Sequence, residues 1–220
     1  MTRWLSWALI AVGAVLLASS GGYFSLVAVS RFQAAQFRNE ELPVEQRRPV
    51  LQPSGPPPFT EATPPLTREW RAFLPPDHVS IPSIGVDSPV TPVGVVVNPQ
   101  GELEWETPKN TVGHNAGTAS PGTPGNMVLS GHISSPIRHE GNVFNRLPEL
   151  KLGDEVLVST PEGAYTYQVV SRRVVEPTEV SVMDPTPQPA VTLITCYPDL
   201  IYTHRLVLRA EPVAFQPAPR

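Results

Sequence analysis

The positions of the prolines restrict most strongly what this 220-residue chain can form. The chain has 28 prolines, and ten of them lie between Pro43 and Pro76, including the run Pro56-Pro57-Pro58. Proline has no backbone N–H, so it belongs neither in a helix interior nor in the middle of a sheet. We therefore expect this stretch to be an extended polyproline-II-like spacer or a disordered one.

An uncharged segment precedes the proline-rich stretch. Residues 4–30 contain no Asp, Glu, Lys or Arg, and about 20 apolar residues suffice to span a bilayer. A cleaved signal peptide is the alternative, because the apolar run 5–17 is followed by the small residues 18–20. The apolar pattern resumes at 23–29, beyond such a cleavage site, which favours an uncleaved membrane anchor.

The remaining sequence has the pattern of one β-rich domain. We predict an N-terminal transmembrane anchor at 1–30, a juxtamembrane and Pro-rich linker at 31–72, a globular domain at 73–215 and a disordered tail at 216–220. Helical signal is limited to one or two turns in 142–150. Many short strands separated by Gly and Pro are typical of an all-β sandwich or barrel. The expected strands are 78–86, 87–96, 101–108, 125–133, 155–160, 164–175, 192–196 and 204–213.

Charge and cysteine content exclude some classes of function. The net charge is −4, and a nucleic-acid-binding domain needs a basic footprint that this composition does not supply. Cys196 is the only cysteine, so no intrachain disulfide can form. A single cysteine in an exported protein suggests either intermolecular pairing or a reactive thiol.

Cys196 ends an apolar strand, and a catalytic thiol in that position needs a base or a positive neighbour to become a thiolate. His132 is the strongest candidate base, because it follows an apolar strand at a strand end, where loops form clefts. We expect His78, His139 and His204 to be solvated or structural. The alternative for Cys196 is a small buried apolar residue at the end of a core strand.

Arg205 begins the strand that returns after Cys196. Two strands joined by a loop place their adjoining ends side by side, so Arg205 can approach the thiol. Arginine stays protonated and cannot act as a base, but it can bind a carbonyl oxygen or a developing oxyanion. A surface ion pair is the alternative role for Arg205.

Five segments in order resemble the sortase family. They are IPSIGVDSPV (81–90), PGTPGN (121–126), LSGH (129–132), VFNRLPELKLGDEV (143–156) and TLITC (192–196), the last followed by Arg205 after nine residues. Together they cover nearly the whole predicted domain. The combination of TLITC, the histidine motif and the arginine is far more specific than TLITC alone.

The resemblance implies a closed eight-stranded β-barrel and a membrane-anchored cysteine transpeptidase. It implies that Cys196 attacks an LPxTG-like sorting signal between Thr and Gly, and that His132 serves as general acid and base. It further implies that Arg205 stabilises the oxyanion and that Thr195 contacts the substrate near it. The acyl-enzyme would pass the surface protein to an amine of a peptidoglycan precursor or of a pilin lysine. The expected location is a bacterial cell membrane, crossed once, with the catalytic domain outside.

The sequence leaves several points open. No cofactor or metal is required, although some sortases bind calcium through acidic loops, for which Glu102, Glu104, Glu106, Glu176 and Glu179 are the candidates. His114, in NTVGHNAGT, could lie behind the cleft or be structural. The segment before the barrel has no Asp-Pro-aromatic motif, so a lid is not supported. No long helical insertion precedes the Cys strand, which argues against the haem-acquisition class of sortases.

Two other functions fit the same residues. One is a thiol peptidase or hydrolase, in which water resolves the acyl-enzyme. The other is a non-catalytic anchored β-domain that binds a cell-wall partner and carries an inert buried Cys196.

Overall fold

The computed structural model describes residues 39–50, 74–97, 101, 103–135 and 140–219, and single positions at 22, 24, 25, 28, 29 and 32. The chain divides into two compact units, 1–38 and 39–220. Most of the predicted anchor at 1–30 lies outside the described residues. Within the described part of the chain, we find no helix with the length and apolar character needed to cross a membrane.

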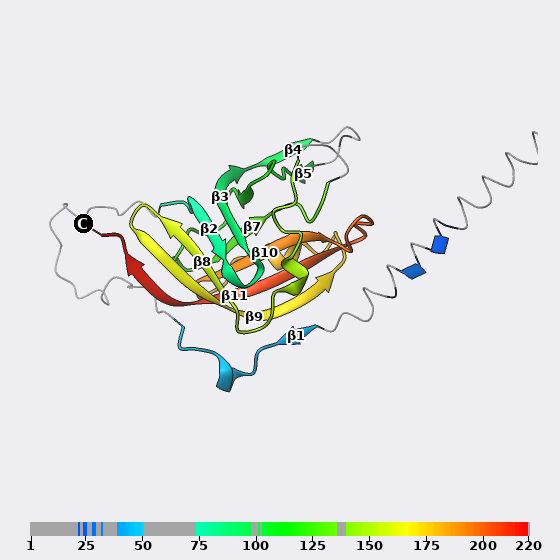
Figure 1. Ribbon diagram of the computed structural model, residues 1–220. Coiled ribbons are helices and arrows are strands. Elements are labelled where there is room, and N and C mark those ends of the chain that lie inside the picture. Colours follow the sequence, from blue (N-terminus) through cyan, green and yellow to red (C-terminus); the bar gives the residue numbers. More distant parts are fainter. Residues whose placement is uncertain are drawn as a thin grey trace, which may run out of the picture. The chain divides into compact units, whose positions relative to one another are not determined.

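The second unit is built on a closed β-barrel (Figure 1). Its strands lie in the order β9-β11-β10-β7-β6-β3-β2-β8, and β8 pairs back to β9, so eight strands form the ring. This confirms the predicted all-β barrel. The strand bounds are β2 His78–Ile81, β3 Val86–Val93, β6 Val112–Asn115, β7 Asn126–Ser130, β8 Glu155–Thr160, β9 Gly163–Val175, β10 Ala190–Tyr197 and β11 His204–Pro217.

Smaller elements surround the ring. Strands β4 (Val95–Val97) and β5 (Leu103–Trp105) form a separate two-stranded sheet. In the described part of this unit, the helical segments are four 3-10 turns: η1 Val44–Gln46, η2 Pro82–Ile84, η3 Leu147–Glu149 and η4 Val180–Met183. The predicted helical turns in 142–150 are therefore one 3-10 turn, and Pro148 lies inside it.

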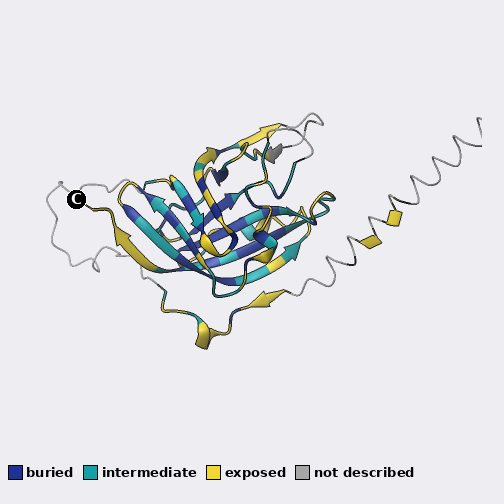
Figure 2. Cartoon of the chain, viewed as in Figure 1, coloured by how far each residue is buried: buried dark blue, intermediate teal, exposed yellow. Residues whose placement is uncertain are grey.

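The barrel core follows from the alternation of side chains along the strands. On β8, Val156 and Val158 are fully buried, while the intervening Leu157 is partly exposed. Successive residues of a strand point to opposite faces, so one residue in two enters the core. Figure 2 shows these buried positions running along the barrel strands. The buried side chains are mainly Val, Leu and Ile, which suit a pleated surface.

Strand β6 was not predicted from the sequence. All four of its residues are buried, and it pairs with β3 in parallel and with β7 in antiparallel orientation. Its sequence, VGHN, contains no alternating apolar pattern. Gly113 is needed there for packing, because a Cβ atom would lie 2.9 Å from Pro108 Cδ. Tertiary packing rather than local propensity therefore makes this segment a strand.

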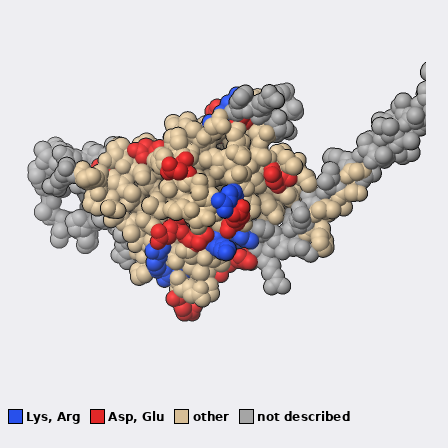
Figure 3. Space-filling view, in the orientation of Figure 1, with Lys and Arg blue, Asp and Glu red and all other residues tan. Residues whose placement is uncertain are grey.

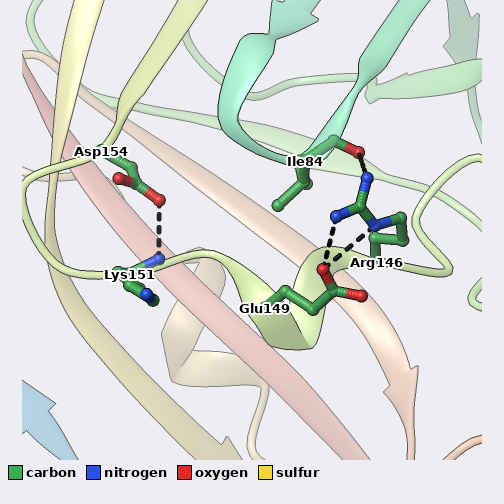
Figure 4. A network of polar contacts seen from close by, with 5 residues as sticks. All are labelled: Ile84, Arg146, Glu149, Lys151 and Asp154. Carbon is green, nitrogen blue, oxygen red and sulfur yellow. Dashed lines mark hydrogen bonds and ion pairs between the residues drawn. The ribbon is translucent and has the colours of Figure 1, made fainter.

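Arg146 ties the segment after the histidine motif to the rest of the barrel. Its Nη1 donates to the carbonyl of Ile84 at 3.2 Å, and its Nη2 lies 2.6 Å from Glu149 Oε2 (Figure 4). Phe144 and Leu147, on either side of it, are fully buried in the core. The segment that leads to β8 is thus fixed from both its polar and its apolar side.

The Gly-Asp turn before β8 is held by local hydrogen bonds. The backbone N–H of Lys151 donates to Asp154 Oδ2 at 2.9 Å (Figure 4). Gly153 has a φ of +90°, which glycine adopts without strain. Its N–H donates to the carbonyl of Val169 on β9 at 2.8 Å, which fixes the start of β8 beside its partner strand.

Residues 39–50, which we call the N-terminal strap, lie against the barrel. Strand β1 (Glu40–Glu41) pairs antiparallel with β9, beside the half of β9 that β8 does not cover. Leu42 is 7% exposed, and its N–H donates to the carbonyl of Val170 at 2.7 Å. Part of the segment expected to be a linker therefore packs on the domain, while 51–73 lie outside the described residues.

Ion pairs along the strap complete its attachment. Arg47 lies 3.6 Å from Glu211 on β11, and Arg48 lies 2.9 Å from Glu155 on β8. On the face drawn in Figure 3, most of the basic side chains lie beside acidic ones.

At the other end of the chain, β11 extends through Pro217. The first residues of the expected disordered tail are therefore paired with β9.

Candidate active site

Cys196 and Arg205 lie opposite each other on the hairpin of β10 and β11. The antiparallel register pairs these two residues directly. Directly opposite residues of an antiparallel pair point to the same face, with Cβ atoms about 4.5–5.5 Å apart. The strand pairing thus places the guanidinium-bearing side chain beside the thiol.

His132 lies on the other flank of Cys196. Strand β7 runs parallel to β10, and Ser130 is the register partner of Ile194. His132 and Cys196 each follow two residues later, at the same edge of the barrel. The N–H of Gly131 donates to the carbonyl of Ile194 at 3.2 Å, so the contact between the two segments continues beyond the end of β7.

The backbone on both sides of His132 is fixed. Thr195 Oγ1 donates to the carbonyl of Gly131 at 2.8 Å, and the N–H of Phe144 donates to the carbonyl of His132 at 2.9 Å. A Cβ atom on Gly131 would lie 2.7 Å from Val143 Cγ1 and 2.8 Å from Phe144 Cδ2. Only glycine fits before His132 without displacing these side chains.

Thr195 is buried and has a hydrogen-bond partner in the structure. Its side chain is 2% exposed, and its hydroxyl is bonded to Gly131. The hydroxyl therefore positions the segment that carries His132. A direct contact between Thr195 and substrate stays a prediction.

The three expected catalytic side chains have polar groups that remain available. Cys196 is a free, partly exposed thiol, and the His132 ring has no hydrogen-bond partner among the described residues. Arg205 donates from Nη1 to the carbonyls of His204 at 3.0 Å and Tyr202 at 3.4 Å. These contacts orient the guanidinium and leave its other N–H groups for an acceptor.

A bridge between loops connects the two sides of the site. Ser134 Oγ, two residues after His132, is hydrogen-bonded to Tyr202 Oη at 2.7 Å and also to the carboxylate of Asp199. These contacts link the loop that follows the histidine to the loop that follows the cysteine. The carbonyl of Tyr202 also accepts a hydrogen bond from Arg205. Sequence reasoning did not find Ser134, since a serine in a loop has no distinctive pattern.

Two other histidines are engaged in surface contacts. His78 Nε2 lies 2.8 Å from Asp87. His204 Nδ1 lies 2.9 Å from Thr203 Oγ1, and its Nε2 lies 3.3 Å from Glu176. Both rings make contacts within their own surroundings, away from the Cys196 thiol's partner strand β7. His139 lies outside the described residues.

His114 is a buried histidine on β6. Its side chain is 8% exposed, and its Nε2 lies 3.0 Å from the carbonyl of Ala119. Burial lowers the pKa of His114 below its usual value of 6.5, while the contact with Ala119 acts in the opposite direction. The register pairs His114 with Leu129, so it lies beside β7, the strand that leads to His132.

The acidic residues considered for calcium do not gather in the described part of the chain. No group of three or more His, Cys, Asp or Glu residues there could hold a metal ion. Glu102 lies outside the described residues, and Glu176 contacts His204. A calcium site stays an untested expectation.

Comparison with known proteins agrees with this architecture. A family model for the sortase domain matches residues 79–213, which is more than half of the chain. The chain belongs to the sortase family. The matched range contains the histidine, cysteine and arginine segments described above.

Curated relatives of this sortase include sortase A of Listeria monocytogenes, 36% identical over 87 residues, or 40% of this chain and 38% of the relative. Sortase D of Bacillus subtilis is 32% identical over 88 residues, or 40% of this chain and 41% of the relative. The match with this chain spans about two fifths of the length of these curated relatives.

Solved structures show the same fold over a larger share. Listeria monocytogenes sortase A has a TM-score of 0.53 at 25% identity, covering 67% of this chain and 92% of that one. Sortase E1 from Streptomyces coelicolor, solved with a tripeptide in its active site, has a TM-score of 0.52 at 25% identity and covers 66% of this chain and 91% of its own.

Proposed function

We propose that this sortase is a cysteine transpeptidase that cleaves an LPxTG-like sorting signal between Thr and Gly and transfers the acyl part to an amine. One observation carries the proposal: Cys196 lies between His132 on the β7 side and Arg205 on the β11 side, at one edge of a sortase barrel. These are a nucleophile, an acid–base group and a cation for the oxyanion.

The first half of the reaction forms an acyl-enzyme. The Cys196 thiolate attacks the carbonyl carbon of the Thr residue and forms a C–S bond, and the oxyanion accepts hydrogen bonds from Arg205. When the intermediate collapses, the C–N bond breaks. The departing amine of Gly takes a proton from the His132 imidazolium, which leaves a thioester on Cys196.

The second half releases the product. The acceptor amine attacks the thioester carbonyl and loses a proton to His132, and the C–S bond breaks to regenerate the Cys196 thiolate. In this proposal the acceptor is an amine of a peptidoglycan precursor or of a pilin lysine. The tripeptide in the active site of the sortase E1 structure supports a peptide substrate for this chain.

The location is also part of the proposal. The uncharged segment 4–30 anchors the protein once in a bacterial cell membrane and leaves the catalytic domain outside. Membrane fractionation tests this: the protein should stay with membranes after alkaline extraction and should be released by detergent. Release by alkaline extraction alone would contradict an anchor.

The decisive test of the activity follows the acyl group. The detergent-solubilised full chain is incubated with an LPxTG peptide, with and without an amine acceptor, and intact protein and products are weighed by mass spectrometry. We expect an adduct on Cys196 that passes to the amine, and no adduct on Cys196→Ala. Hydrolysed peptide alone, in the presence of amines, would favour the hydrolase. Absence of any adduct over a panel of sorting peptides would contradict catalysis.

A further inference from the structure

A polar pocket of about 460 Å³ lies on the outer face of the barrel. Its floor comes from β9, β10 and β11, and its walls come from η4 with the residues after it and from the strap. On β11, Leu206, Leu208 and Ala210 enter the core. The alternate residues Arg209 and Glu211 line the pocket.

The pocket shares its sheet face with the thiol. In the register of β10 and β11, Cys196 pairs with Arg205 and Thr192 pairs with Arg209. Residues separated by an even number along a strand point to the same face. Thr192 and Arg209 therefore lie four residues along the strands from the Cys196–Arg205 pair, which is about 13 Å at roughly 3.3 Å per residue.

The direction of a bound peptide follows from the two flanks of Cys196. His132 must reach the departing amine, so the leaving part of the substrate lies on the β7 side. The pocket lies mainly over β11 and β9, on the Arg205 side. The acyl part of an extended peptide therefore runs from Cys196 toward the pocket, and about four residues cover the intervening 13 Å.

Arg209 is the partly buried charge of this pocket that has no partner among the described residues. Its Nε is buried and has no hydrogen-bond partner among the described residues. The other partly buried charges, Arg47 and Glu211, are paired with each other at 3.6 Å. The remaining charged residues of the lining are exposed to solvent: Glu41, Arg173 and Asp184.

The neighbouring polar side chains do not offer Arg209 an acceptor. Asn126 Oδ1 accepts from Thr192 at 2.7 Å, and Asn126 Nδ2 donates to the carbonyl of Val182 at 3.0 Å. A buried N–H group such as Arg209 Nε is costly when it has no acceptor. A carboxylate is the group that matches a guanidinium best, because it can accept two parallel hydrogen bonds.

We propose that Arg209 binds an acidic side chain of the sorting signal, at the residue directly before the LPxT core. This rests on the proposed transpeptidase function and adds a specificity site to it. The pocket thereby distinguishes signals by the charge of a residue outside the cleaved motif.

The test compares peptides that differ at one residue. With the detergent-solubilised full chain, kcat/KM for acylation is measured for LPxTG peptides preceded by Glu or by Gln. We expect a preference for Glu of about tenfold, as for a charge-assisted hydrogen bond, and a smaller preference at high salt. Glu placed instead after the Gly, on the leaving side, should give no gain.

Variants assign the preference to one side chain. In Arg209→Gln the ratio of the two rates should fall to near one. Arg48→Gln removes an equal charge from an exposed arginine that does not line the pocket, and it should keep the ratio. Equal rates for both peptides in the natural chain, or a preference that persists in Arg209→Gln, would overturn the proposal. The comparison in the natural chain stands even if that variant does not fold.

A binding measurement separates this proposal from the transpeptidase proposal. If no peptide forms an adduct, both labelled peptides are titrated against Cys196→Ala and followed by fluorescence anisotropy. Tighter binding of the Glu peptide would support the subsite although the reaction proposal had failed. Equal binding, or none, would overturn the subsite.

Discussion

Removal of the Thr195 hydroxyl should impair the histidine side of the site. In the structure this hydroxyl is buried, and it donates to the carbonyl of Gly131, directly before His132, at 2.8 Å. Thr195→Val keeps the shape of the side chain but leaves that buried carbonyl without its donor. An unsatisfied buried acceptor costs about 1–3 kcal/mol, which is well below the roughly 5–15 kcal/mol that holds a domain folded. The variant should therefore fold.

The effect on catalysis distinguishes two roles for Thr195. If the hydroxyl positions His132, then Thr195→Val lowers kcat and leaves KM nearly unchanged, because binding does not use the imidazole. A displacement of about 1 Å in a catalytic group can cost roughly 100-fold in rate, so we expect a loss of about 10- to 100-fold. If the hydroxyl contacts substrate, as the family resemblance implies, KM should rise instead.

Thr195→Ser is the matched control. It loses one methyl group, which costs about 0.8 kcal/mol of stability, but it keeps the hydroxyl that bonds to Gly131, so kcat should stay close to the natural value. Urea unfolding gives the stability change, and peptide acylation gives kcat and KM separately. The reasoning is refuted if Thr195→Val has the stability and kcat of the natural chain, or if Ser and Val impair kcat equally.

Three further predictions test the packing around the site. Gly131→Ala should destabilise the domain by about 1–3 kcal/mol through overpacking and should lower activity, because the added Cβ would lie 2.7 Å from Val143. Gly94→Ala is the control: its Cβ enters open space, so neither stability nor activity should change. Leu42→Ala should lower the free energy of unfolding by about 2 kcal/mol, because Leu42 packs on the barrel. The exposed control Val44→Ala should leave the urea midpoint unchanged, and an unchanged midpoint in Leu42→Ala would contradict the packing of the strap on β9. The folded pKa of His114 is lowered from 6.5, so its contribution to stability is complete above about pH 6.5 and is lost as the pH falls toward the folded pKa. Unfolding free energies from pH 5 to 7 should therefore depend less on pH in His114→Gln than in the natural chain, and equal slopes would refute this.

The barrel strands were largely predictable because their signals are local. In β8 and β9, alternating apolar residues flank a turn at 161–163, and the structure shows the antiparallel pair β8–β9 there. The approach of Arg205 to Cys196 also follows from local sequence, since a hairpin fixes which ends adjoin. The position of His132 beside Cys196 depends on the non-local, parallel pairing of β7 with β10, which no local pattern predicts.

Features that depend on tertiary packing could not be read from local patterns. Strand β6 has no alternating pattern and contains Gly113, so its strand form comes from β3 and β7 on either side. The sequence predicts a Pro-rich linker here, because the strap contains Pro43 and Pro49 and has a single well-buried apolar residue, Leu42. Its attachment depends on the edge of β9 that β8 leaves uncovered.

The strap and the pocket together connect a segment outside the sortase match to the proposed substrate site. The family model begins at residue 79, so it does not include the strap. Yet Glu41 and Arg47 of the strap line the pocket, and Arg47 pairs with Glu211 beside Arg209. Glu211 lies two residues from Arg209 on the same strand face, so without Arg47 its carboxylate would be free to compete with an acidic substrate for Arg209. On the proposed role of Arg209, the strap would therefore contribute to recognition by engaging Glu211.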